Sequence, residues 1–375
     1  MPTEMRESEQ QPAEPLDQLL EYGRGNGYQL DWLRKRETWG NELHPDMEHG
    51  GLRLQDAEVG PFGEVPDVSD NETGRPRGAL RREDAPRVGS YRVKSKSEIW
   101  MRNAAALYEE ALTRQWSSAT DVPWETLKPL PDDIERAECE LATFLSDVEF
   151  VAGDVPGRWI SDTSPDFFEP RMFLVSQIMD EARHLDVFRK RALANGGGLM
   201  QQSRAFAGGF GSSIDNARDF TEMSVRLHIS GEGLILSVFR MGERMAYNDA
   251  EKEIYRLCGS DESRHVAFGV MHLRYLAEAE PERKEEIHCL LDEVEAGLAI
   301  GEGTSSQNLL TRVGSTGSSL AVLLGAGNIE EGEKLAQAMR QRQIKEYIQR
   351  VKVSGFGERF ENGRSGPVLM KYVAG

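Results

Sequence analysis

The chain of 375 residues has few cysteines and no long apolar segment. It contains no run of about 18 apolar residues, so we expect no transmembrane helix and no membrane partner. The three cysteines are odd in number and scattered, which argues against a disulfide framework and favours reduced thiols in a cytoplasmic protein. The acidic, polar start of the sequence does not have the pattern of a signal or transit peptide.

The chain also lacks an excess of positive charge. It has 45 Lys and Arg residues and 63 Asp and Glu residues, which gives a formal net charge of −18. Proteins bind the phosphate backbone through clustered Lys and Arg, so this balance argues against a nucleic-acid partner. The hydrophobic content of 39% and the charged content of 29% are typical of a globular protein.

Strand signals are weak throughout, whereas helical periodicity is clear after about residue 95. Residues 1–95 are rich in Gly and Pro and poor in apolar residues, which predicts an extended, partly disordered arm. Residues 96–300 are predicted to form an all-α bundle, and residues 301–375 a tail with one clear helix at about 329–352. Within the bundle, helices are expected at about 97–116, 132–152, 165–195, 216–247, 249–279 and 282–299.

One five-residue pattern occurs twice, as Asp-Glu-Ala-Arg-His at Asp180–His184 and as Asp-Glu-Ser-Arg-His at Asp261–His265. A Glu and a His three residues apart lie on one face of a helix. A single such pair is commonly a solvated surface pair, but its duplication within one chain is much rarer by chance. Two such pairs, with one Glu from each of two other helices, are the ligand set of a di-iron or di-manganese bundle.

Two further carboxylates are candidates for bridging the metals from the partner helices. Glu232 lies in an otherwise apolar stretch, where a buried carboxylate is unfavourable unless it binds a cation or pairs with an arginine such as Arg226. Glu149 precedes the first motif glutamate by 32 residues (149 to 181), and Glu232 precedes the second by 30 (232 to 262). These similar offsets favour Glu149 over Glu138 and Glu140 on the same predicted helix.

The remaining charged residues of the motifs are predicted to support the ligands. Asp180 and Asp261 could accept hydrogen bonds from the imidazoles and fix their tautomers, while Arg183 and Arg264 could neutralise these aspartates. Ordinary surface ion pairs are the alternative reading. His228 lies one turn before Glu232, and we expect it to contact the ligands or to pack nearby; an extra metal ligand is the less favoured alternative.

At these residues the chain resembles the ferritin-like, ribonucleotide-reductase-like di-iron superfamily, and most closely the hydroxylase subunits of bacterial multicomponent monooxygenases. The stretches around Glu149, Asp180–His184, Glu232 and Asp261–His265 match the ligand motifs of these proteins in order and approximate spacing, over about residues 100–280. The resemblance implies a ferritin-like four-helix bundle with additional helices. It also implies two Fe ions, with Mn as an alternative, bound by Glu149, Glu181, His184, Glu232, Glu262 and His265.

Two positions depart from this family pattern. Phe188 occupies the position of the radical tyrosine of ribonucleotide reductase, which argues against a stored tyrosyl radical. Leu236 replaces a threonine that is usual in the monooxygenase hydroxylases. By helical spacing, Leu185, Phe188, Leu236 and Phe239 are candidates to line an apolar substrate pocket, with ordinary core packing as the alternative.

The leading functional hypothesis is a di-iron oxygenase or oxidase that uses O₂ to hydroxylate or N-oxygenate a small organic substrate. Such an enzyme needs external electrons, for which we expect a ferredoxin or flavin reductase, and a homodimer is among the assemblies considered. The alternatives are a non-catalytic, ferritin-like iron-binding protein and an acyl desaturase. Turnover with O₂ uptake separates the enzymes from the binding protein, and product identity separates the two enzymes.

Overall fold

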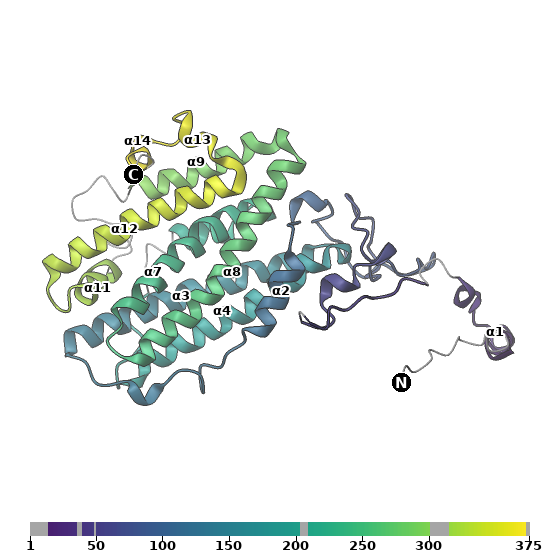
Figure 1. The fold of residues 1–375 in the computed structure, drawn as a ribbon, viewed down its shortest axis with the longest axis horizontal. Coiled ribbons are helices and arrows are strands. Elements are labelled where there is room, and N and C mark those ends of the chain that lie inside the picture. Colours follow the sequence, from purple (N-terminus) through teal and green to yellow (C-terminus); the bar gives the residue numbers. More distant parts are fainter. Residues whose placement is uncertain (1–13, 36–39, 49, 203–208, 301–314, 373–375) are drawn as a thin grey trace.

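A computed structural model describes residues 14–35, 40–48, 50–202, 209–300 and 315–372. Every regular element in these ranges is a helix, and β pairing is limited to three isolated bridges, so the predicted all-α architecture is confirmed. None of the described helices combines the length and apolar character needed to cross a bilayer. The bundle is built from α3 (Asp132–Asp162), α4 (Phe168–Ala194), the run α6 (Phe220–Ser224), η8 (Val225–Glu232) and α7 (Gly233–Met245), and α8 (Asp249–Ala279) (Figure 1).

Shorter elements complete the bundle and link its long helices. They are η4 (Lys96–Glu98), α2 (Ala104–Thr113), η5 (Trp124–Thr126), η6 (Pro165–Phe167), α5 (Gly211–Asp215), η9 (Pro281–Arg283) and α9 (Lys284–Ile300). The helix expected at about 97–116 is therefore shorter than predicted, whereas the one expected at 249–279 has the predicted bounds.

The helix expected to end before Gly153 continues for nearly three more turns, to Asp162, through Gly153 and Pro156. Gly153 does not end the helix but permits close packing, because a Cβ there would lie 3.2 Å from Cβ of Glu181 on α4. Buried apolar side chains on both sides of Pro156, such as Ala152 and Trp159, hold this part of α3 in the core. Tertiary packing thus overrides the local stop signals that the sequence contains.

The long helix expected at 216–247 begins at Phe220, where the side chain of Asp219 caps it by accepting a hydrogen bond from the backbone N–H of Glu222. It includes a π-helical segment, η8, that ends at Glu232. Such segments add a residue to the helical turn and are frequent at functional sites. Here the irregular turn leads directly into the predicted metal ligand.

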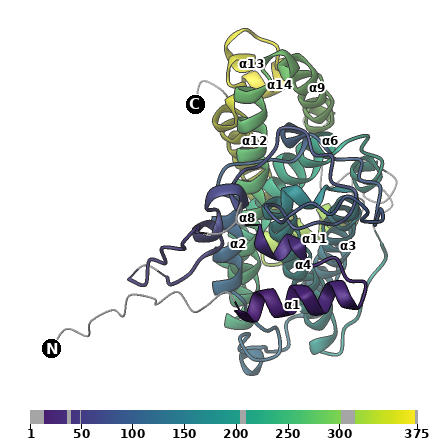
Figure 2. The ribbon, with the colours of Figure 1, turned by 90° about the vertical axis from the view of Figure 1, so that its right-hand side faces the viewer.

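The arm contains one helix that the sequence analysis did not anticipate, α1 (Glu14–Gly25), and the short turns η1 (Asp31–Arg34), η2 (Leu54–Ala57) and η3 (Gly60–Phe62). In Figure 2 the arm faces the viewer at one end of the bundle. Arg77 connects it to the bundle: this buried side chain donates hydrogen bonds to the Glu169 carboxylate at the start of α4 (2.8 Å) and to the backbone carbonyl of Asp166 in η6 (2.9 Å). The division into arm, bundle and tail stays a prediction.

The tail contains more helices than the one expected. The structure shows α11 (Ser315–Leu324), α12 (Ile329–Val351), η10 (Lys352–Phe356), α13 (Glu358–Glu361) and α14 (Pro367–Met370). Figure 1 shows α12 running along the flank of the bundle beside α9. Buried residues of α12, including Ile344 and Tyr347, share a hydrophobic cluster with Leu276 of α8 and Leu290 of α9. The elements of four or five residues were missed because such short segments carry almost no periodic signal, and the ten-residue α11 was missed as well.

Candidate dinuclear metal centre

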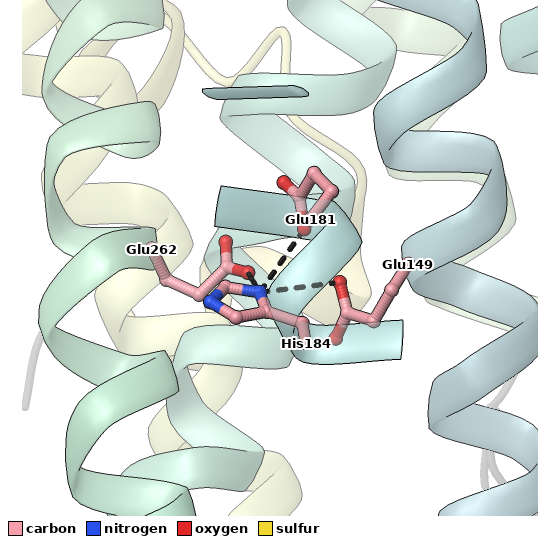
Figure 3. Close-up of side chains that lie close together, drawn as sticks. All are labelled: Glu149, Glu181, His184 and Glu262. Carbon is pink, nitrogen blue, oxygen red and sulfur yellow. Dashed lines mark hydrogen bonds and ion pairs between the residues drawn. The ribbon is translucent and has the colours of Figure 1, made fainter. Parts of the chain in front are cut away.

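The six predicted ligands come from four different elements and converge in the middle of the bundle. Glu149 comes from α3, Glu181 and His184 from α4, Glu232 from η8, and Glu262 and His265 from α8. All six side chains are at least 97% buried. Figure 3 shows the carboxylates of Glu149, Glu181 and Glu262 gathered around the ring of His184.

The ligand atoms form two overlapping groups, within each of which all atoms lie within 4.8 Å of one another. One group contains Glu149, Glu181, His184 and Glu262; the other contains Glu181, Glu232, Glu262 and His265. Each group has three carboxylates and one imidazole, a donor set suited to Fe(II) or Mn(II). Glu138 and Glu140 are buried on the same helix as Glu149 but belong to neither group.

Glu181 and Glu262 are the two residues shared by both groups. The Glu181 carboxylate places one oxygen 3.1 Å from Nδ1 of His184 and its other oxygen 3.1 Å from Nδ1 of His265. Glu262 does the same at 3.4 and 3.5 Å. The motif glutamates therefore have the bridging geometry, because α4 and α8 turn them toward the centre between the two histidines.

Glu149 and Glu232 take the outer positions, contrary to the expectation that they bridge. Glu149 lies 3.7 Å from Nδ1 of His184, and Glu232 lies 3.5 Å from Nδ1 of His265. The spacing of the sequence motifs shows which residues share a helical face, but it does not show which carboxylates lie between the two imidazoles.

Several of these buried polar atoms have no hydrogen-bond partner among the described residues. They are one oxygen each of Glu149 and Glu181, both oxygens of Glu262, and Nδ1 of His265. Buried polar atoms are almost always paired, and an unpaired one is strongly destabilising. Two divalent cations would satisfy these atoms, and four carboxylates would balance their charge. The residues present thus fit a dinuclear metal centre.

The outer nitrogens of the two histidines face aspartates, and the pairing crosses between the two motifs. Nε2 of His184 lies 3.2 Å from Asp261, and Nε2 of His265 lies 3.2 Å from Asp180. With Nε2 as the donor, Nδ1 of each ring is left with its lone pair directed at the carboxylates, as a metal ligand requires. Aspartates were predicted to contact the imidazoles, and they do, but it was not predicted that each histidine would contact the aspartate of the other motif.

The two arginines of the motifs join these aspartates into one network. Arg183 contacts both Asp180 and Asp261, and Arg264 donates to both as well. Because both aspartates are about 99% buried, these are not the exposed surface pairs considered as the alternative. Trp116, which the sequence analysis did not connect with the site, donates its indole N–H to Asp261 over 2.7 Å. It lies in a loop 145 residues away in sequence, so no local pattern indicated this contact.

In the absence of a cation, burial and the close spacing of the carboxylates and imidazoles shift the pKa values of these side chains. Burial and the neighbouring Glu181 carboxylate raise the pKa of Glu149 well above its ordinary value, and burial with Glu262 does the same for Glu232. Burial opposes the charged form of His265, but Glu181 and Asp180 raise its pKa well above the usual range. Protons therefore neutralise the centre where cations would, and metal binding must release them.

Two nearby residues, Cys258 and His228, lie outside both ligand groups. Burial raises the pKa of the Cys258 thiol to about 12 in the metal-free protein. Nε2 of His228 contacts the side-chain oxygen of Gln177, whose amide donates to Glu232 over 3.1 Å. Gln177 was missed by the sequence analysis, although it lies one turn before Glu181 on the same face of α4.

The residues predicted to line a substrate pocket lie in packed surroundings. Phe188 and Phe239 stack at 5.5 Å between ring centres and belong to the main hydrophobic core, and Phe239 meets the ring of His184 edge-on. Leu236 is buried and Leu185 is half-buried. Their role in substrate binding stays a prediction.

A cavity of about 20 Å³ reaches the centre from a different direction. Glu149 and Glu232, the two outer carboxylates, are among its lining residues, although the surface that faces the cavity is apolar. The rest is apolar or small: Val148, Val151, Ala152, Phe210, Ile214, Leu227, Gly231 and Ile235. Helical spacing indicated which residues lie near the metals, but not on which side of the centre the packing leaves space.

Comparison with solved structures defines the class of fold. The helical core has the fold of the R2-like ligand-binding oxidases, a ferritin-like helical bundle, so the predicted fold is confirmed.

Two similar structures illustrate the match. One is a variant of an R2-like ligand-binding oxidase with an anaerobically reconstituted Mn/Fe cofactor, at 19% identity and a TM-score of 0.52, with 68% of this chain and 94% of that chain covered. The other is a variant with an aerobically reconstituted Fe/Fe cofactor, at 18% identity and the same TM-score and coverage. No protein-family model and no curated protein matches the sequence.

Proposed function

We propose that this protein is an O₂-dependent oxidoreductase with a dinuclear metal centre of two Fe ions, or of Mn and Fe. The observation that carries the proposal is the pair of overlapping ligand groups, each with three carboxylates and one imidazole, whose inward atoms lack protein partners. The similar structures have Mn/Fe and Fe/Fe cofactors, which favours these metals over other divalent ions.

Each ligand has a distinct role in this proposal. Glu181 and Glu262, which belong to both ligand groups, would hold both metal ions. Glu149 with His184, and Glu232 with His265, complete the two halves. Asp261 and Asp180 hold the imidazoles with Nδ1 facing inward, and the arginines neutralise these aspartates. When bound, the reduced metal pair supplies the electrons that activate O₂.

The surroundings of the centre favour a substrate with an apolar group near the oxidised atom. The cavity beside Glu149 and Glu232 is enclosed by aliphatic side chains and Phe210, which exclude water and favour apolar groups. We propose hydroxylation or N-oxygenation of a small organic molecule, with electrons from a ferredoxin or flavin reductase. The substrate's reactive group would lie on the side of the outer carboxylates.

O₂ consumption by the metal-loaded protein tests this function. The Fe(II)-loaded protein should take up O₂ rapidly, and a Glu262→Ala variant should bind less metal and lose the uptake. Glu138→Gln is the matched control, because Glu138 is also a buried glutamate in the bundle but lies outside both ligand groups. Stable Fe(II) binding without O₂ uptake would refute the oxidase proposal and favour the iron-binding alternative.

A further inference from the structure

A chain of buried hydrogen bonds ends on one of the two outer carboxylates. Gln177 lies 3.1 Å from Oε1 of Glu232 through its amide nitrogen and 3.2 Å from Nε2 of His228 through its amide oxygen. Nδ1 of His228 lies 2.9 Å from the hydroxyl of Ser224. Gln177, His228 and Ser224 are fully buried, so no bulk water competes for these bonds.

The carboxylate fixes the direction of every bond in this chain. An ionised Glu232, as in a metal complex, can only accept, so Gln177 must present its NH₂ group to it. The amide oxygen then faces His228, which must donate from Nε2. Nδ1 of His228 is left as an acceptor for the Ser224 hydroxyl. Ser224 therefore donates to His228, His228 donates to Gln177, and Gln177 donates to Glu232, which allows one orientation of the amide.

His228 is itself held in place by close packing. Gly269 on α8 leaves the space that it occupies, since a Cβ at Gly269 would lie 2.4 Å from Cβ of His228. The ring of Phe268 packs edge-on against the imidazole at 5.3 Å. Burial lowers the pKa of His228 to about 3, which keeps the ring neutral and its Nδ1 free to accept. The imidazole is thus a fixed support for the amide of Gln177.

The other outer carboxylate has no such support. Oε1 of Glu149 has no hydrogen-bond partner among the described residues, and its Oε2 faces His184. The corresponding Oε1 of Glu232 is bound by Gln177, and its Oε2 faces His265. The two halves of the centre share the same ligand types, but only one of them has an outer carboxylate restrained by the protein.

We propose that Gln177, supported by His228 and Ser224, is a positioning residue that fixes Glu232 and thereby makes the metal position beside His265 different from the position beside His184. The inference rests on the proposed dinuclear centre and extends it. With Oε1 bound by Gln177, Glu232 would hold an ion through Oε2 alone, whereas both oxygens of Glu149 would be open to an ion.

The test compares the occupancy of the two positions within one molecule. Crystals of the full chain are loaded with Mn(II) below saturation, and anomalous scattering gives the occupancy beside His184 and beside His265. In Gln177→Leu the affinity of the position beside His265 should fall by about 10- to 100-fold, as expected for loss of a residue that orients a ligand. The position beside His184 should change much less.

Two sets of variants separate positioning from general destabilisation. Gln343→Leu is the matched control, since Gln343 is another buried glutamine, whose amide donates to the backbone carbonyl of Leu234 rather than to a ligand. His228→Leu should reproduce the Gln177→Leu result, whereas His228→Gln, which keeps a donor near the position of Nε2, should restore the wild-type ratio of occupancies. This pair also tests the proposal if Gln177→Leu does not fold.

Equal loss of Mn(II) from both positions, or the same ratio in Gln177→Leu as in Gln343→Leu, would overturn the positioning role while leaving the dinuclear centre intact. A wild-type protein that binds no Mn(II) or Fe(II) at these residues would instead overturn the proposed function, and this inference with it. A selective loss beside His265, rescued by His228→Gln, would establish it.

Discussion

Glu138 should make the stability of the protein depend on pH through a group far from the metal ligands. It lies in a cluster where one guanidinium, Arg191, pairs with Glu251 and Glu135, and it makes no ion pair with that arginine itself. Burial and the charge of Glu251 raise its pKa from 4.5 to about 8. The folded protein therefore keeps Glu138 protonated at neutral pH, whereas the unfolded chain ionises it.

The sign of the effect follows from this difference. A carboxyl group with a raised pKa contributes its full stability below pH 4.5, and that contribution is lost as the pH rises toward 8. The loss is about 1.4 kcal/mol for each pH unit, which amounts to roughly 4 to 5 kcal/mol across the interval. Glu138→Gln replaces the neutral carboxyl with a neutral amide of the same shape, so its unfolding free energy should lack this dependence.

Denaturant unfolding of both metal-free proteins from pH 4.5 to 8.5 measures the difference. The two curves should meet near pH 4.5 and diverge as the pH rises, with the variant more stable by several kcal/mol at pH 8. Glu138 and Glu149 lie 11 residues apart on α3, or about 16 Å along the helix, so titration of the metal ligands should cancel between the two proteins. Parallel curves, or a variant that is less stable at pH 8, would refute the reasoning.

Three further outcomes are expected. Glu149→Ala should lose bound metal, whereas Glu140→Ala, on the same helix but outside both ligand groups, should retain it; equal metal content by elemental analysis would contradict the ligand assignment. Rapid mixing of the Fe(II) protein with O₂ should leave no lasting tyrosyl signal in electron paramagnetic resonance spectra, since Phe188 replaces the radical tyrosine; a stable signal in high yield would contradict this. Leu227→Ala enlarges the cavity and should change substrate selectivity more than metal content, while Leu273→Ala, at a buried leucine outside the cavity lining, should not; the reverse ranking in product analysis would place the substrate elsewhere.

The sequence was sufficient to predict the helical bundle and the residues that the structure gathers into two ligand groups. Both rest on regular helical periodicity: a Glu and a His three residues apart must share a face, and similar offsets predict two similar hairpins. The observed bounds of α8 match the predicted ones, since its helical periodicity is regular over its whole length. The excess length of α3 could not be predicted, because Gly153 acts through its contact with Glu181, a residue from another helix.

The features that the sequence did not reveal all depend on three-dimensional placement. The bridging role of Glu181 and Glu262 depends on how α4 and α8 face each other, and the crossed partnership of Asp180 and Asp261 depends on the same packing. Gln177 is one turn from a ligand, but an isolated glutamine on a helix carries no distinctive signal. The cavity appears beside the outer carboxylates because side chains from several elements leave space there.

The central claim is that six side chains bind two metal ions, and a crystal structure of the protein loaded with Fe(II) without oxygen tests it most directly. Anomalous scattering at the iron edge should show two peaks per chain. One should lie among Glu149, Glu181, His184 and Glu262, and the other among Glu181, Glu232, Glu262 and His265. A well-ordered structure with no iron at these residues, or with a single ion bound outside the two groups, would contradict the account.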